Sequence, residues 1–228
     1  INKQTGEILQ QSSQLQNIVY PLHLTTNNDF LVGCRSGGLY QLDPCSMNIN
    51  WLGSFGGGVY SLAWSKSLGL TLLAGRDGQL YALDDQCKLR WVLPVASDRL
   101  WNVELNRSGR IMLATSYDKN LYLVDLTTPR VMEKINLGGG SVTTVILLQH
   151  GLAACGTLGK KIYLLALNKI IAKIEMPDPV CTLIEHPRGG PLFASGYRGQ
   201  IWLLDHAGII LDEFALDDLV MCAYHLVQ

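Results

Sequence analysis

An aromatic residue recurs along this chain at nearly constant intervals. The copies lie 41, 41, 41 and 39 residues apart: Tyr40, Tyr81, Tyr122, Tyr163 and Trp202. An Asp stands three positions after four of the copies, with Ala166 as the exception: Asp43, Asp84, Asp125 and Asp205. A fixed period of roughly 40 residues indicates that one supersecondary unit is copied along the chain.

Each unit reads as four short strands. In the unit at 57–97, β-branched and aromatic residues alternate with polar ones in the runs VYSLAW, TLLAG, QLYALD and KLRWVL, and turn residues separate the runs. A sheet of consecutive hairpins has two apolar faces, so it needs a copy on either side to bury both. A β-propeller blade has this design and takes roughly 40 to 45 residues. The sequence therefore predicts an all-β fold, a β-propeller of four-stranded antiparallel blades.

The repeats account for the whole chain as one β-propeller domain, 1–228. We expect five complete blades, at 18–56, 57–97, 98–138, 139–177 and 178–217. Residues 1–17 match only an outer strand and residues 218–228 only an inner strand, so each end supplies part of a further blade. The simplest interpretation is a piece of a longer ring of six or more blades, with seven as the favoured number. A closed five-bladed ring is the alternative.

Two known families share features of these repeats. The segment SLAWSKSLGLTLLAGRDGQLYALD resembles the WD-repeat β-propellers, in which a strand, a Ser-rich turn, a strand, an Asp-Gly turn and a strand ending in Trp-Asp follow one another. The chain lacks that family's Gly-His and any literal Trp-Asp, and keeps the turn Asp only as Asp77 and Asp118. The segments TGEILQ and KLRWVL are similar to quinoprotein-like (PQQ-type) propellers. The first resemblance implies a scaffold or sensor for protein partners, and the second implies an enzyme.

Composition excludes several classes of partner. Lys and Arg number 18 against 19 Asp and Glu, and no basic cluster exceeds Lys160-Lys161, so we predict no nucleic-acid partner. No apolar run reaches the about 18 residues that span a bilayer, so we predict no membrane insertion. The six cysteines lack CxxC spacing and fall mostly in predicted strands, which indicates buried thiols in a reducing compartment. We therefore expect a cytoplasmic protein.

Motifs for catalysis are weak in this chain. There is no GxSxG motif, and the Gly-rich segments at 53–58 and 156–161 lack the spacing and the following helix of a phosphate-binding loop. A quinoprotein enzyme would need a Trp at the end of most repeats and two adjacent cysteines, which the chain does not have. His23, Glu185 and His225 lie at similar places on predicted inner strands and form the one candidate metal set. We predict no catalytic residue, no metal and no cofactor.

Surface recognition is the remaining class of function. In propellers, the loop before each inner strand and the hairpin between the middle strands open on one face, around the mouth of the central channel. That face would hold residue types that dominate binding hot spots. The predicted partner-binding residues are Arg35, Tyr60, Arg76, Asp98, Arg99, Trp101, Tyr117, Tyr197 and Arg198.

Other interpretations compete for these residues. Asp77 and Asp118 are ordinary turn formers, and Tyr60 and Trp101 suit the space between blades.

The predicted function is a non-catalytic propeller that binds a protein or peptide partner at the channel mouth. The alternatives are a quinoprotein-like or metal-dependent propeller enzyme, and an architectural subunit whose outer edges assemble a complex.

Overall fold

The computed structural model describes residues 19–25, 29–149, 151–166, 168–186, 189–205 and 207–216. Within them, twenty β-strands form five separate four-stranded sheets, each with its strands in consecutive antiparallel order. The predicted all-β fold with repeated four-stranded blades is confirmed. The partial blades predicted at 1–17 and 218–228 lie outside the described residues.

The strands of each blade follow one another along the chain. Blade 1 comprises β1 (Val19–Leu24), β2 (Phe30–Cys34), β3 (Gly38–Leu42) and β4 (Ile49–Ser54). Blade 2 comprises β5 (Val59–Ser65), β6 (Leu70–Gly75), β7 (Gln79–Leu83) and β8 (Leu89–Pro94). Blade 3 comprises β9 (Leu100–Leu105), β10 (Ile111–Ser116), β11 (Asn120–Asp125) and β12 (Arg130–Asn136). Blade 4 comprises β13 (Val142–Leu147), β14 (Leu152–Thr157), β15 (Lys161–Ala166) and β16 (Lys169–Glu175). Blade 5 comprises β17 (Val180–Glu185), β18 (Leu192–Gly196), β19 (Gln200–Leu204) and β20 (Ile210–Ala215).

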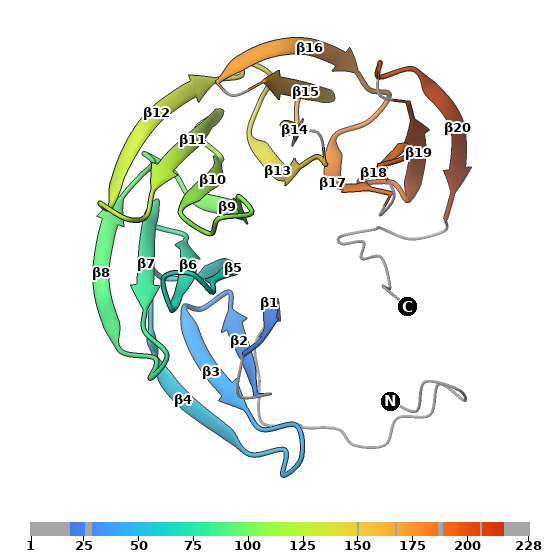
Figure 1. Cartoon of the computed structure of the whole chain (residues 1–228). Helices are drawn as coiled ribbons and strands as arrows, with labels where there is room; N and C mark the ends of the chain where they lie inside the picture. Colours follow the sequence, from blue (N-terminus) through green and yellow to red (C-terminus); the bar gives the residue numbers. More distant parts are fainter. Residues whose placement is uncertain are drawn as a thin grey trace.

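The blades are arranged in an arc around a common centre (Figure 1). The first strand of each blade lies nearest the centre and the fourth lies on the rim. Each inner strand contacts the inner strand of the next blade, from β1 to β5, β9, β13 and β17. Blades 1 and 5 stand at the two ends of the arc (Figure 1).

In four of the five blades, an Asp at the end of the third strand or directly after it shapes the turn to the outer strand. Its side chain accepts backbone hydrogen bonds from the residues that follow. The Asp84 carboxylate accepts from the N–H groups of Gln86 and Lys88, both at 2.9 Å. Asp205 repeats this with Ala207 and Ile209, at 2.9 and 2.8 Å. The recurring Asp is therefore explained by the turn it stabilises, as Asp residues commonly do.

The apolar core is divided among the junctions between blades. At the junction of blades 2 and 3, Leu72 and Leu80 of one sheet pack with Met112 and Val124 of the other, and all four are fully buried. Similar clusters lie between blades 1 and 2, 3 and 4, and 4 and 5. Blades 2, 3 and 4 thus bury both apolar faces against their neighbours, as expected for stacked repeats.

Candidate functional site

Two sets of loops meet on one face of the arc, which we call the mouth face. The linker before each inner strand lies against the hairpin turn between the two middle strands of the same blade. In blade 2, the Arg76 N–H donates to the Gly58 carbonyl at 2.9 Å; in blade 3, the Tyr117 N–H donates to the Arg99 carbonyl at 3.1 Å. These backbone bonds hold the linker and the hairpin turn of each of these two blades together at the mouth face.

Three aromatic side chains form a continuous row on the mouth face. The rings of Tyr60, on β5, and Trp101, on β9, stack with centroids 4.8 Å apart and planes 28° apart. The Tyr117 ring, from the turn after β10, follows at 5.0 Å from Trp101. The Arg99 guanidinium lies over the Tyr117 ring, 4.6 Å from its centroid. We call Tyr60, Trp101, Tyr117 and Arg99 the aromatic row.

The row extends toward blade 5 through Tyr197, in the turn between β18 and β19. Burial raises the pKa of Tyr197, and the neighbouring Tyr117 and Cys181 raise it further. The interaction with Tyr117 connects turns of two blades that are not adjacent in the arc. Tyr60 is buried, Trp101 and Tyr117 are half-buried, and Tyr197 is exposed. The row therefore passes from the blade interior to solvent.

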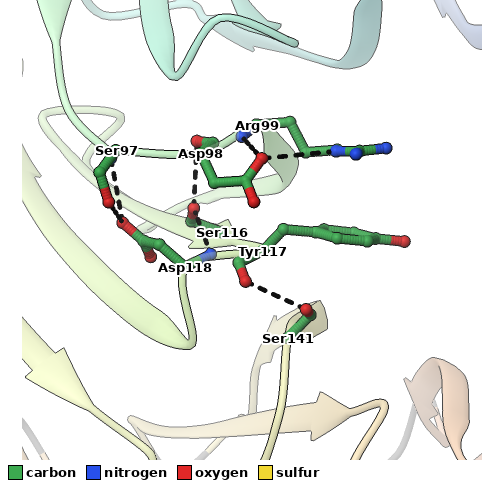
Figure 2. A network of polar contacts seen from close by, with 7 residues as sticks. All are labelled: Ser97, Asp98, Arg99, Ser116, Tyr117, Asp118 and Ser141. Atoms are coloured by element: carbon green, nitrogen blue, oxygen red, sulfur yellow. Dashed lines mark hydrogen bonds and ion pairs between the residues drawn. The ribbon is translucent and has the colours of Figure 1, made fainter.

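Polar contacts fix the backbone beneath the row (Figure 2). The Ser116 hydroxyl donates to the Asp98 carbonyl at 3.2 Å, and the Ser141 hydroxyl of the next linker donates to the Tyr117 carbonyl at 3.0 Å. The Asp98 carboxylate accepts from the Arg99 N–H at 2.7 Å and lies 3.6 Å from the Arg99 Nε. Figure 2 shows how these bonds connect loops of blades 3 and 4 around Tyr117.

Asp118 belongs to this network and serves the turn. Its carboxylate accepts the Tyr122 hydroxyl at 2.5 Å, and both the N–H and the hydroxyl of Ser97 at 3.1 Å. Burial tends to raise the pKa of Asp118, but the hydrogen bonds outweigh it and the pKa is lowered. Asp77 accepts the Tyr81 hydroxyl at 2.5 Å in the same way. The interpretation of both Asp residues as turn formers agrees with these contacts.

The remaining predicted residues surround the row without joining it. Arg35 and Arg76 are exposed at the tips of their hairpin turns. Arg198 is 79% exposed, and its Nε lies 3.9 Å from Asp178. Among the described residues, no hydrogen bond, ion pair or ring contact joins these three Arg side chains to the aromatic row. The geometry therefore groups Tyr60, Arg99, Trp101, Tyr117 and Tyr197, with Asp98 paired to Arg99, and leaves the other three Arg residues at the periphery.

A second feature, which sequence reasoning missed, lies at the opposite ends of the strands. A cavity of about 850 Å³ opens at the junction of blades 3 and 4. Its walls are mostly apolar: Leu105, Ile111, Leu113, Leu123, Met132, Leu147, Leu148 and Ala153. Polar side chains at its edges are Glu104, Asn106, Arg107, Glu133, Gln149 and Asn168. We call it the junction pocket.

The candidate metal set is not assembled in the described part of the molecule. His23 lies on β1 and Glu185 on β17, in the blades at the two ends of the arc, and His225 lies outside the described residues. His23 pairs with Leu31 in blade 1, and Glu185 pairs with Leu192 in blade 5. By these pairings, His23 and Glu185 lie at places on their inner strands that differ by one residue. The described residues contain no group of three or more His, Cys, Asp or Glu that could hold a metal ion. They also contain no helix of the length and apolarity needed to cross a bilayer.

Comparisons with known proteins bear on the fold. No protein-family model matches the chain, and no curated protein matches it. A chain in the crystal structure of the mitotic checkpoint complex superposes with a TM-score of 0.81, at 14% sequence identity, over 90% of this chain and 67% of that chain. The fold is a β-propeller.

This likeness supports one of the two resemblances found in the sequence. The WD-repeat resemblance is supported at the level of the fold, and the quinoprotein-like resemblance is not. At 14% identity, the likeness concerns the architecture alone. The function has to be argued from the site, because propellers carry many unrelated functions.

Proposed function

We propose that this propeller is a non-catalytic, WD-repeat-like module that binds a protein or peptide partner on its mouth face, as part of a larger assembly. The observation that carries the proposal is the aromatic row with Arg99 stacked on its end. Trp, Tyr and Arg are the residues most enriched in binding hot spots. The solved relative belongs to a multiprotein complex, which is consistent with protein partners.

The row is also organised before any partner arrives. Trp101 is held between two Tyr rings, and Tyr117 is held by its neighbours and by the backbone bonds of Figure 2. Ordering side chains on binding costs about 0.5 to 1.5 kcal/mol for each flexible one. A row that is already ordered avoids most of that cost. The exposed Arg35, Arg76 and Arg198 would add polar contacts at the rim of the same interface.

A second proposal, the architectural subunit, is favoured by a separate observation. The outer strands expose large apolar side chains, among them Trp51, Leu89, Val92, Ile171 and Phe214. Exposed apolar surface of this kind marks interaction sites when it is contiguous. In this alternative, the rim of the propeller contacts the complex and the mouth face does not. A cytoplasmic location stays a prediction for both proposals.

One experiment separates the two. The double variant Arg76→Ala/Trp101→Ala removes one Arg and one Trp from the mouth face. Its matched control, Arg90→Ala/Trp51→Ala, removes the same residue types from outer strands, where Trp51 is 65% exposed. Proteins captured from cells that express the chain are quantified by mass spectrometry for wild type and both variants, after circular dichroism has shown unchanged folds.

The mouth-face proposal predicts that specific partners are lost from the first variant and retained by the control. The reverse result supports the architectural alternative and refutes the mouth-face proposal. Equal capture by wild type and both variants contradicts both proposals, because neither surface then contributes to binding.

A further inference from the structure

The junction pocket exists because three equivalent positions carry different side chains in adjacent junctions. Met112 pairs with Leu105 in blade 3, and Ala153 pairs with Leu147 in blade 4. Met112 and Ala153 therefore occupy equivalent positions in the two blades. Met112 is fully buried and fills the junction of blades 2 and 3. Ala153 leaves that space empty between blades 3 and 4.

The outer strands show the same difference. Trp91 pairs with Ala82 in blade 2, and Glu133 pairs with Leu123 at the equivalent place in blade 3. Trp91 packs into the junction of blades 2 and 3, beside Met112. Because Glu133 is smaller than Trp91, the junction of blades 3 and 4 is wider at this place than the junction of blades 2 and 3, and it carries a negative charge. By contrast, smaller cavities at two other junctions measure about 30 and 40 Å³.

Glu104 is the third difference. At its place on the inner strand, blades 2, 4 and 5 carry Ala63, Ile146 and Ile184. The Glu104 carboxyl lines the pocket and is largely withdrawn from water, which raises its pKa to about 7. Among the described residues, none donates a hydrogen bond to it. A carboxyl that is partly shielded from water and has no donor is costly to ionise, so a ligand that brings a donor gains by pairing with it.

The other charges around the pocket leave this carboxyl without compensation. The Glu133 carboxylate accepts a hydrogen bond from the Asn168 side-chain amide at 3.0 Å, which fixes it at the pocket edge. Arg107 lies in the exposed turn after β9, where water solvates its charge. The pocket therefore combines apolar walls with two carboxyl groups, one held in place and one unpaired.

We propose that the junction pocket is a binding site for a small organic cation with an apolar body, whose charged nitrogen pairs with Glu104 and Glu133. The volume lies in the range of small-molecule sites, about 300 to 1,000 Å³. A hollow of this shape suits a compact ligand, whereas a folded partner needs about 800 Å² of surface on each side. The pocket lies on the face opposite the aromatic row, so this proposal does not depend on the mouth-face function.

The methionines provide the measurement. In protein labelled with ¹³C at the methionine methyl groups, Met132 reports on the pocket that it lines, and buried Met176 reports on the junction of blades 4 and 5. The probes are n-octylammonium, 1-octanol and octanoate, titrated separately at pH 8, where Glu104 is mostly ionised. We expect n-octylammonium to shift the Met132 signal with about tenfold higher affinity than 1-octanol, because it makes a charged hydrogen bond. Met176 should not shift.

Variants test the assignment of residues. Glu104→Gln should lower the affinity for n-octylammonium about tenfold and leave that for 1-octanol unchanged. Glu175→Gln, a change of the same type on the exposed outer strand β16, is the control and should change neither. Ala153→Met should lower the affinity for n-octylammonium and for 1-octanol by narrowing the pocket.

Three results would overturn the proposal. One is octanoate binding as tightly as n-octylammonium, and another is an unchanged n-octylammonium affinity in Glu104→Gln. The third is a Met132 signal that no probe moves but that a peptide containing Leu and Lys does move, which would assign the pocket to a polypeptide. The order of affinities in the wild-type protein decides the matter even if a variant fails to fold.

Discussion

The unpaired carboxyl of Glu104 should make the stability of this propeller depend on pH, and Glu104→Gln should remove that dependence. Folding moves the carboxyl from water into the apolar junction pocket, which raises its pKa from 4.5 to about 7. A raised carboxyl pKa means that the folded state holds the proton more tightly than the unfolded state does. The associated stability is complete below pH 4.5 and is lost as the pH rises through about 7.

The size of the effect follows from the pKa difference. One pKa unit corresponds to about 1.4 kcal/mol, so the ionised carboxylate lowers the free energy of unfolding at pH 8 by about 3 kcal/mol at most. Glutamine has nearly the same shape and carries no charge. We therefore expect Glu104→Gln to match wild type near pH 4 and to be more stable by about 2 to 3 kcal/mol at pH 8.

Urea denaturation followed by tryptophan fluorescence measures this at pH 4, 6 and 8. Glu175→Gln is the control, because Glu175 is exposed and its carboxylate lies 2.9 Å from the Lys173 ammonium on the same strand. If the curves of unfolding free energy against pH run parallel for wild type and Glu104→Gln, the carboxyl is solvated and the reasoning about the junction pocket is wrong.

Four further predictions concern other parts of the fold. Tyr122→Phe should lower the free energy of unfolding by about 1 kcal/mol, because the buried hydroxyl no longer donates to Asp118, and chemical denaturation checks this. Because hydrogen bonds lower the pKa of Asp118, its stabilising effect is present at neutral pH and is lost in acid, so Asp118→Asn should flatten the acid limb of the stability curve. Ala153→Met should raise the unfolding free energy by about 1 kcal/mol in thermal denaturation, since the burial of new methylene groups exceeds the loss of side-chain entropy. Exposed Cys45 should react quickly with a thiol reagent, whereas fully buried Cys155, whose pKa is raised by burial, should not react until the protein unfolds.

Much of the architecture could be predicted because it depends on local signals. The alternation of apolar and polar residues, the turn residues and the period of 41 residues together predict a four-stranded sheet for each repeat. The runs VYSLAW and TLLAG, for example, correspond to β5 and β6. The mouth face could also be anticipated, because every hairpin of a given kind opens on the same side. The contacts of Tyr60 with Trp101 follow from their equal places in adjacent repeats.

The junction pocket could not be predicted in the same way, because it depends on register between repeats. The turn before the outer strand is one residue longer in blade 3 than in blade 2, so Glu133, and not Met132, takes the place of Trp91, while both blades keep the same bulge. The sequence shows that Trp91 is not repeated near this place, but it does not show that the junction stays open there. One signal was present in the sequence: Glu104 is a carboxylate where aligned repeats carry Ala63 and Ile146.

The construction of the junctions has a consequence for how such a molecule can change. Each seam is made by the same few positions of two neighbouring repeats, and the seams share no side chains at those places. Substitutions can therefore open a cavity, close it or change its charge at one seam, while the other seams keep their packing. A propeller of this design therefore has several independent places where substitutions can create a new ligand preference without disturbing the packing of the other blades.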